Sequence, residues 1–370
     1  MKFSRQQIYV LLSVATAFTF VIAALNVSAA RTETESRTAK VVLGERLYFD
    51  KRLSADGTVS CASCHDPATA FASKDTVSVG VKDANGTRNV PTLLNAKFGV
   101  SFFWDGRART LEEQATQPLL NIAEMGLESE AVLVARLSAI PEYRNAFLRL
   151  FPREGITLKT VAGAIAAYER TLVSNDSPFD RFIKGERRAL TANQKAGWAL
   201  FKGKARCIEC HAVSMATPLF TDSKFYNTGV ATRGQEFGVL NQRAGELKLR
   251  KRSDSALLAH DPVFSELGRF LVTHDDKDIG AFKTPSLRDV ELTGPYMHNG
   301  SLRTLLDVIR FYNEGGRKNP NLDPRMRVLD LRENEMNQLV EFLRTLTSDA
   351  VLRRAQSAKP QTRAAVSLVP

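Results

Sequence analysis

The sequence predicts a mostly α-helical protein that consists of two similar domains with long loops. A Cys-x-x-Cys-His pattern occurs twice, at residues 61–65 and 207–211. Each copy follows a helix-like segment, residues 44–49 in the first case and 197–201 in the second, so a unit of helix and loop is duplicated. Apart from short ambiguous pieces, no run alternates between apolar and polar residues as a half-buried strand does.

The chain of 370 residues suffices for two domains, each with its own hydrophobic core. The hydrophobic fraction is 44% and the charged fraction is 25%, both ordinary values for a soluble globular protein. This composition excludes a fibrous chain and a wholly disordered one.

The first thirty residues have the three parts of a secretory signal peptide. Lys2 and Arg5 precede an apolar run over residues 8–25, and small residues at 27–30 offer a cleavage site. An uncleaved membrane anchor is the alternative, because the run approaches the ~20 residues that span a bilayer. In both cases the rest of the chain is exported, which in a bacterium means to the periplasm.

The formal net charge is +11. Nucleic acid is nevertheless not an expected partner, because the chain is exported. A basic face would steer an acidic redox partner towards the protein, although solvated surface charge explains the same excess.

The two repeated patterns contain all four cysteines of the chain, and a histidine follows each pair. Exported cysteines usually form disulfides, but Cys-x-x-Cys-His is the pattern that attaches c-type haem. The thiols add across the haem vinyl groups, and the histidine becomes an iron ligand. A zinc site would need more ligands than the remaining histidines supply twice, and a redox dithiol does not need the histidine. The sequence therefore predicts two covalently bound haem c groups on Cys61, Cys64, His65, Cys207, Cys210 and His211.

The two patterns lie 146 residues apart (207 − 61), which is too far for one small domain to hold both. We expect a first domain over residues 41–174 and a second over residues 179–348, each closed by an amphipathic helix. Residues 31–40 are expected to be polar and mobile. Residues 349–370 are expected to form a polar tail.

Several further segments resemble the bacterial di-haem cytochrome c peroxidases, the family that includes MauG. They occur in the family's order and, with both haem patterns, they extend the resemblance over roughly residues 41–348. The segments are residues 89–95, 103–108, 111–118, 124–125, 282–290 and 293–298.

The resemblance implies a peroxidatic haem on His65 with a distal pocket. Glu124 matches the glutamate that moves a proton between the two peroxide oxygens. Gln114 matches a pocket glutamine, and Pro118 matches a residue that shapes the pocket. Trp104 matches the tryptophan between the haems. Taken alone, Glu124 would be an ordinary surface carboxylate and Trp104 a core residue, but the matched spacing favours the functional interpretation.

The resemblance also implies a calcium ion between the domains. Asn89, Thr293 and Pro295 match positions that contribute oxygen atoms, and oxygen ligands suit a hard cation. Without the resemblance, Asn89 would simply set a turn before Val90-Pro91.

Three positions depart from the pattern of many family members. Val81 stands where they have a removable histidine over the first haem, so this haem should be five-coordinate or water-bound in the oxidised protein. Tyr312 stands where the second haem of the peroxidases usually has a methionine ligand. A tyrosine at this position resembles MauG, and a phenolate favours ferric iron. Met297 as the ligand, or a structural role for Tyr312, is the alternative. Ala205 replaces the tryptophan through which MauG oxidises its protein substrate, which puts that task in doubt.

Three functions are consistent with these features. The first is a periplasmic peroxidase that reduces hydrogen peroxide to water with electrons from a small cytochrome c or cupredoxin. The second is a MauG-like oxidase that stores two oxidising equivalents across both haems and acts on a protein or a small molecule. The third is an electron-transfer protein without catalysis. Peroxide distinguishes them by rapid turnover, by a long-lived oxidised state, or by no reaction.

Overall fold

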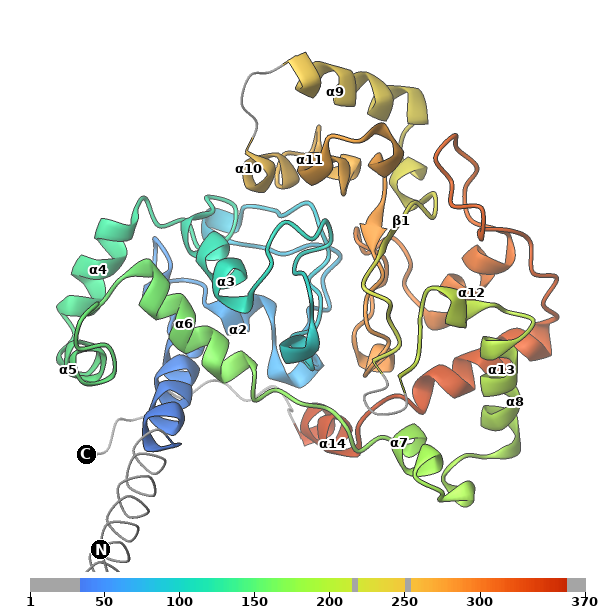
Figure 1. Ribbon diagram of the computed structural model, residues 1–370, viewed down its shortest axis with the longest axis horizontal. Coiled ribbons are helices and arrows are strands. Elements are labelled where there is room, and N and C mark those ends of the chain that lie inside the picture. Colours follow the sequence, from blue (N-terminus) through green and yellow to red (C-terminus); the bar gives the residue numbers. More distant parts are fainter. Residues whose placement is uncertain (1–33, 215–218, 250–253, 358–370) are drawn as a thin grey trace, which may run out of the picture.

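The computed structural model describes residues 34–214, 219–249 and 254–357 (Figure 1). The predicted signal peptide, residues 1–30, lies outside this part. Helices dominate, which confirms the predicted fold class. The strands among the described residues are the antiparallel pair β1 (Phe225–Tyr226) and β2 (Phe282–Lys283). No helix in these ranges is both long enough and apolar enough to cross a membrane.

The first half of the chain begins with a helix that includes residues 34–49. Residues 34–40 are therefore helical, and the expectation of a mobile segment is wrong for them. The helix is held because Leu43 and Leu47 are buried in the same apolar core as residues of α6. The other α-helices of this half are α2 (Cys61–Cys64), α3 (Leu111–Leu120), α4 (Glu130–Ser138), α5 (Pro141–Leu150) and α6 (Leu158–Glu169).

The second half contains more helices and a separate core. Its α-helices are α7 (Pro178–Ile183), α8 (Ala192–Lys202), α9 (Phe237–Leu249), α10 (Ser255–Ala259), α11 (Phe270–Thr273), α12 (Leu305–Asn313), α13 (Glu333–Arg344) and α14 (Asp349–Ser357). The described short 3-10 helices are η1 (Lys51–Leu53), η2 (Pro67–Thr69), η3 (Val81–Asp83), η4 (Ala96–Phe98), η5 (Arg187–Ala189), η6 (Cys207–Glu209), η7 (Val230–Thr232), η8 (Ser265–Leu267), η9 (Asp276–Asp278) and η10 (Val290–Leu292).

Each half is built on one close crossing of two helices. The helix before the Cys-x-x-Cys-His pattern crosses the closing helix, which is α6 in the first half and α13 in the second (Figure 1). A Cβ atom on Gly44 would lie 1.8 Å from the carbonyl oxygen of Ala164, and one on Gly197 would lie 2.0 Å from that of Gln338. Both crossings therefore require glycine, because only glycine lets the two backbones approach so closely.

The structure reveals a second repeat, at an offset of 194 residues (285 − 91). Residues 91–118 and 285–312 have the same order of turn, 3-10 helix, isolated bridge and α-helix. In each copy a residue in the left-handed region precedes a 3-10 helix, Asn95 before η4 and Asp289 before η10. A threonine N-cap then starts the next helix: Thr110 accepts a hydrogen bond from the backbone N–H of residue 113, and Thr304 from that of residue 307.

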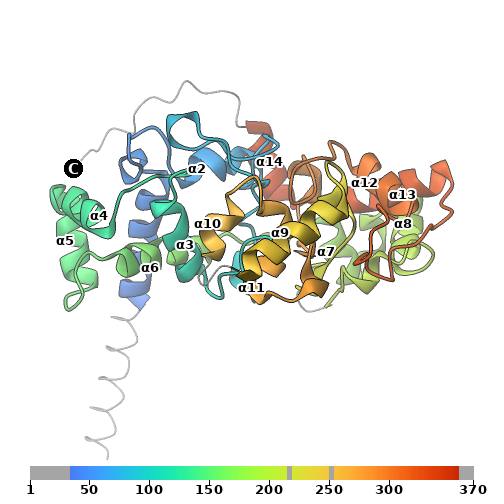
Figure 2. The ribbon, with the colours of Figure 1, turned by 90° about the horizontal axis from the view of Figure 1, so that it is seen from above.

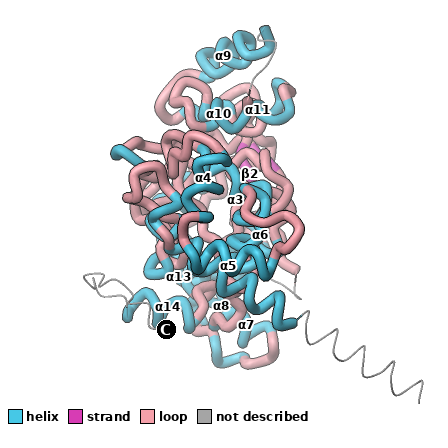
Figure 3. Tube along the Cα trace, turned by 90° about the vertical axis from the view of Figure 1, so that its left-hand side faces the viewer, coloured by secondary structure: helices cyan, strands magenta, loops and turns pink. Residues whose placement is uncertain are grey.

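The second half carries an insertion that the first half lacks. Pro91 follows His65 by 26 residues (91 − 65), whereas Pro285 follows His211 by 74 (285 − 211), and residues 230–282 lie within the longer stretch. This inserted unit contains α9, α10 and α11 and has its own apolar cluster around Leu240, Leu267 and Phe270. Its helices form a layer at one rim of the molecule (Figures 1 and 3). Seen from above, the layer lies over the seam between the two halves (Figure 2).

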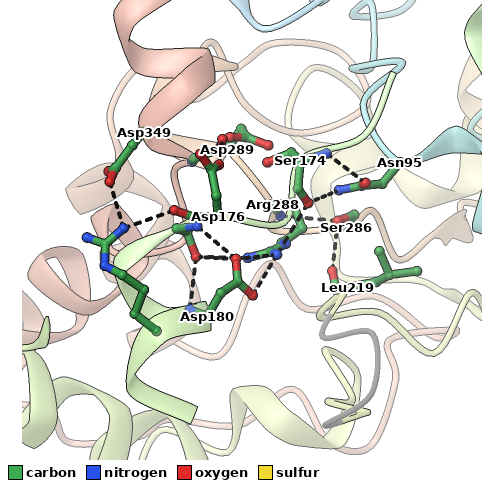
Figure 4. Close-up of polar contacts among 12 residues, drawn as sticks. Asn95, Ser174, Asp176, Asp180, Leu219, Ser286, Arg288, Asp289 and Asp349 are labelled. Carbon is green, nitrogen blue, oxygen red and sulfur yellow. Dashed lines mark hydrogen bonds and ion pairs between the residues drawn. The ribbon is translucent and has the colours of Figure 1, made fainter. Parts of the chain in front are cut away.

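A buried polar cluster fastens the segment that connects the halves (Figure 4). Arg288 donates to both carboxylate oxygens of Asp180, at 2.8 and 2.7 Å, and to the hydroxyl of Ser177 at 3.0 Å. The Asn95 amide exchanges two hydrogen bonds with the backbone of Ser174, at 2.9 and 3.0 Å. Because Arg288 and Asp180 are only 2% and 4% exposed, their charges are compensated by each other rather than by water.

Residues 349–357, predicted as the start of a polar tail, form helix α14. The helix returns from the second half to pack against the first. Val351 is buried in one apolar cluster with Phe71, and Arg354 lies over the Phe71 ring at 5.5 Å from its centroid. Asp349 pairs with Arg181 at 2.6 Å. Helix α14 thus joins both halves beside the loop that follows the first Cys-x-x-Cys-His pattern.

Candidate active site

A continuous cavity runs between the two halves and reaches both Cys-x-x-Cys-His patterns. The six residues predicted to attach haem line it: Cys61, Cys64, His65, Cys207, Cys210 and His211. None of the four cysteines forms a disulfide with another. The structure therefore brings both patterns to one cavity, as a protein with two neighbouring haems requires.

Both histidines are fixed as haem ligands need to be. The Nδ1 atom of His65 lies 3.2 Å from the carbonyl oxygen of Phe71, and that of His211 lies 2.9 Å from the carbonyl oxygen of Phe220. A carbonyl can only accept, so each Nδ1 carries the hydrogen and each Nε2 keeps its lone pair. Burial lowers the pKa of both imidazoles, that of His65 to about 4, so both are neutral at pH 7. Two thiols and a neutral imidazole in each half fit a c-type haem.

A tight turn after α3 presents Glu124 to the cavity. The Glu124 N–H donates to the carbonyl of Asn121, and the Glu124 carbonyl accepts from the Val81 N–H at 2.9 Å. A Cβ on Gly80 would lie 2.6 Å from the Glu124 carbonyl oxygen, so glycine is needed where the two loops meet. The backbone of Glu124 is thus held from both sides.

The carboxyl of Glu124 is poorly solvated. Its Oε2 atom is buried and has no hydrogen-bond partner among the described residues. Burial raises the pKa of Glu124 to about 7, and Arg107 and Asn121 counteract only part of this effect. A group that is half ionised near neutral pH can both accept and donate a proton.

Gln114, Pro118 and Trp104 line the same cavity as Glu124. The first two lie on α3, one turn apart. The Trp104 indole N–H donates to the carbonyl of Asn89 at 2.8 Å, which fixes the orientation of its ring. The three positions that the resemblance assigned to the distal pocket therefore lie around one cavity with Trp104, which it assigned to the space between the haems. Their catalytic roles stay predictions.

Val81 is buried and packs against Gly126 in the turn that carries Glu124. A valine side chain has no atom that ligates iron. The backbone of Val81 instead supports the Glu124 turn, so this position takes part in building the pocket.

Tyr312 and Met297, the rival ligands of the second haem, both line the cavity. The 194-residue repeat distinguishes them, because Tyr312 corresponds to Pro118 and Met297 corresponds to Phe103. Pro118 lies one turn from Gln114 on the helix that precedes Glu124. Tyr312 therefore occupies, in the second half, the position that shapes the predicted distal pocket in the first. The position favours Tyr312 over Met297.

The three predicted calcium ligands, Asn89, Thr293 and Pro295, also line the cavity. Both amide hydrogens of Asn89 have acceptors, the carbonyls of Asp75 and Thr76 at 3.2 and 3.3 Å. Its Oδ1 atom therefore remains as the side-chain oxygen that can bind a cation. Among the described residues no group of three or more His, Cys, Asp or Glu side chains could hold a metal ion, so neutral oxygens would have to do so.

Sequence reasoning missed a charged group beside Glu124. Arg107 is paired with the fully buried Asp105 at 2.9 Å, and Arg88 pairs with the same carboxylate at 2.6 Å. His260 of the inserted unit lies 4.0 Å from Glu124, measured from Nε2 to Oε1. Nothing in the local sequence around His260 marks it as a pocket residue, because the contact joins segments far apart in the chain.

Sequence reasoning also missed the pair of His298 and Glu266 beside Trp104. His298 occupies the position that corresponds to Trp104 in the 194-residue repeat, and the two rings meet edge to face with centroids 6.5 Å apart. The His298 ring stacks on Phe282 at 3.5 Å and pairs with Glu266 at 2.8 Å. The sequence analysis included His298 in the resembling segment 293–298 without a role, and the repeat was a signal that could have paired it with Trp104.

A second buried carboxyl, Glu169 at the end of α6, lines the cavity too. Burial raises its pKa to about 8. Its Oε2 atom lacks a partner among the described residues. Sequence reasoning treated this position only as part of the closing helix.

Comparison with known proteins identifies relatives over most of the chain. Residues 38–188 match the di-haem cytochrome c peroxidase family. Cytochrome-c peroxidase IdrP2 of Denitromonas iodatirespirans is 38% identical over 84% of this chain and 82% of its own length. The methylamine utilization protein MauG of Methylorubrum extorquens is 38% identical over 84% of this chain and 78% of its own. A solved MauG-like protein associated with microbial copper homeostasis superimposes with a TM-score of 0.71 at 33% identity, over 86% of this chain and 92% of that one.

Proposed function

This chain belongs to the di-haem cytochrome c peroxidase family, and from that premise we propose that it reduces hydrogen peroxide to water in the periplasm. The reaction consumes one peroxide, two protons and two electrons and yields two water molecules. A small cytochrome c or cupredoxin would supply the electrons. The bound haems supply the redox chemistry, and the protein's own residues bind, orient and move protons.

The main support for this proposal is the Glu124 carboxyl. Cleavage of the O–O bond needs a group that takes the proton from one peroxide oxygen and returns it to the other. With a pKa of about 7, Glu124 can do both at neutral pH. Its turn is fastened to Gly80 and Val81, so the carboxyl is placed before peroxide arrives.

The side chain at position 81 supports a first haem that is open to peroxide. Valine has no atom that could ligate a haem iron held by His65, so no reductive activation would be needed. We expect high-spin ferric haem in the EPR spectrum of the oxidised protein. A purely low-spin spectrum would contradict an open site.

A MauG-like oxidase is the second candidate, and Tyr312 favours it. As a phenolate ligand, Tyr312 would lower the reduction potential of the second haem and favour the storage of oxidising equivalents. Ala205 is buried in the core of the second half, so it offers no aromatic exit towards a protein substrate. The peroxidase reaction is therefore the better-supported proposal.

One measurement separates the two candidates. Peroxide is added to the oxidised protein by stopped flow, with and without reduced cytochrome c, and the optical spectrum is followed. Continuous oxidation of cytochrome c supports the peroxidase. A long-lived oxidised species that does not consume cytochrome c supports the MauG-like reaction, and no spectral change in either arm contradicts both.

We further propose one calcium ion between the halves, held by oxygens of Asn89, Thr293 and Pro295. The support is the amide of Asn89, whose two N–H groups are engaged and whose Oδ1 remains for a cation. Metal analysis of the purified protein should find one calcium per chain.

We also propose that residues 1–30 export the protein, either as a cleaved signal peptide or as an uncleaved anchor. The mass of the mature protein, compared with that of the full sequence, distinguishes the two.

A further inference from the structure

The inserted unit, residues 230–282, is fastened to the loops that build the first half's side of the cavity. Thr87 donates through its hydroxyl to the carbonyl of Ala259 at 2.7 Å. Arg88 donates to the carbonyl of Ser265 at 2.8 Å, and Arg269 donates to the carbonyl of Asp105 at 2.9 Å. Ala259 precedes His260 in the sequence, and Ser265 and Arg269 follow it. The three bonds therefore fix the position of the segment that carries His260.

His260 faces the Glu124 carboxyl across a short gap. Its side chain is 17% exposed and lines the cavity together with Glu124. The Nε2 atom lies 4.0 Å from Glu124 Oε1 and 3.5 Å from the nearer terminal nitrogen of Arg107. A sub-ångström movement of either side chain would bring Nε2 and Oε1 to the outer limit of hydrogen-bond distance.

The charges around His260 decide which group carries the proton. Arg107 can only donate, so Nε2 faces it as an acceptor and the ring hydrogen sits on Nδ1. Burial and the charges of Arg107 and Arg88 lower the pKa of His260 to about 4, and Asp105 opposes them only in part. At pH 7 the imidazole is therefore neutral, so its Nε2 lone pair, which also faces Arg107, could accept a hydrogen bond from protonated Glu124 without taking its proton.

We propose that His260 is a positioning residue for Glu124, which it holds in the pocket by accepting a hydrogen bond from the protonated carboxyl through Nε2. The inserted unit thus completes, from the second half, the proton-transfer site of the first. This inference rests on the proposed peroxidase function for its purpose. The contact between the two side chains can be tested without that function.

The test compares His260→Phe with His260→Gln in the haem-loaded, full-length protein. Phenylalanine keeps the ring and the burial but removes the acceptor, whereas glutamine can return an oxygen near the position of Nε2. Exposed His274 lies in the same inserted unit, so His274→Phe is the matched control. Thermal unfolding confirms that each variant is folded.

The first readout is the protonation of Glu124 itself, followed by infrared difference spectra of the carboxyl band against a Glu124→Gln reference. Loss of an acceptor for the neutral form lowers the midpoint of this titration by about half to one pH unit. We expect this shift in His260→Phe, and a midpoint near the wild-type value in His260→Gln and His274→Phe. An unshifted midpoint in His260→Phe overturns the proposal, as does an equal shift in His260→Gln.

The second readout is the rate of the reaction between peroxide and the oxidised protein. We expect a loss of at least about tenfold in His260→Phe at pH 7, because the protonated carboxyl that returns the proton to the second peroxide oxygen is no longer held in place, with substantial recovery in His260→Gln. A wild-type protein that does not react with peroxide contradicts the proposed function alone, because the infrared titration still decides the role of His260.

Discussion

Replacing Glu124 with glutamine should remove most of the reactivity towards peroxide. Glutamine has nearly the same shape but cannot take or return a proton. A positioned acid–base group contributes about 10²–10⁴-fold to a rate. We therefore expect the second-order rate constant of the oxidised protein with peroxide to fall by about that factor at pH 7.

The pKa of Glu124 fixes how the rate depends on pH. Burial raises this pKa to about 7, so about half of the carboxyl groups are ionised at pH 7. The ionised form is the one that accepts the proton of peroxide. Each further unit of acidification lowers the ionised fraction about tenfold, which leaves about 1% at pH 5. The wild-type rate should therefore rise with pH up to about 7 and then level.

Stopped-flow mixing between about pH 5 and pH 9 checks both expectations. Glu128→Gln is the matched control, because Glu128 is exposed and lies four residues away in the same loop. It should retain the wild-type rate and profile. If Glu124→Gln kept the fall in rate below pH 7, another group would be responsible for it and the reasoning from Glu124 would fail.

Three further substitutions test the second haem and the fold. Tyr312→Phe should change the low-spin EPR signal of the second haem and raise its reduction potential, whereas Tyr296→Phe, at another tyrosine of the cavity, should do neither. Gly197→Ala should lower the free energy of unfolding by about 1–3 kcal/mol, because the new Cβ would lie 2.0 Å from a carbonyl oxygen. Gly163→Ala, in an open position of α6, should raise it by up to about 1 kcal/mol; similar losses for both glycines in urea unfolding would refute the crossing argument. Arg288→Met should cost about 3–5 kcal/mol, because it leaves the buried Asp180 carboxylate without its partner, and a loss below about 1 kcal/mol would show that water reaches this cluster.

The fold class could be predicted because the Cys-x-x-Cys-His pattern constrains its surroundings. Attachment at three adjacent side chains requires a short loop after a helix, and the sequence repeats that arrangement. The helices at the two ends of the described chain could not be predicted in the same way. Residues 34–40 and 349–357 are polar on average, yet each belongs to a helix that buries a few apolar residues, such as Val351. Average polarity hides such a narrow apolar stripe.

The pocket was only partly predictable for a different reason. Glu124 and Gln114 follow one another along a single turn and helix, so their spacing carries the signal. His260 reaches the same place from a unit inserted elsewhere in the chain, and a single sequence holds no trace of that contact. The 194-residue repeat was present in the sequence, but few of its positions are identical. The shared left-handed residues, such as Asn95 and Asp289, become evident only from the backbone.

The repeat has a consequence for how the two haem sites differ. Its two copies have closely similar backbones, and Trp104 meets His298, its own counterpart, where the copies face one another. The two haem sites are therefore built on similar backbone segments, and they differ through a handful of unequal side chains such as Pro118 and Tyr312. The residues at matched positions, rather than the backbone, would then decide which half reacts with peroxide and which half receives electrons.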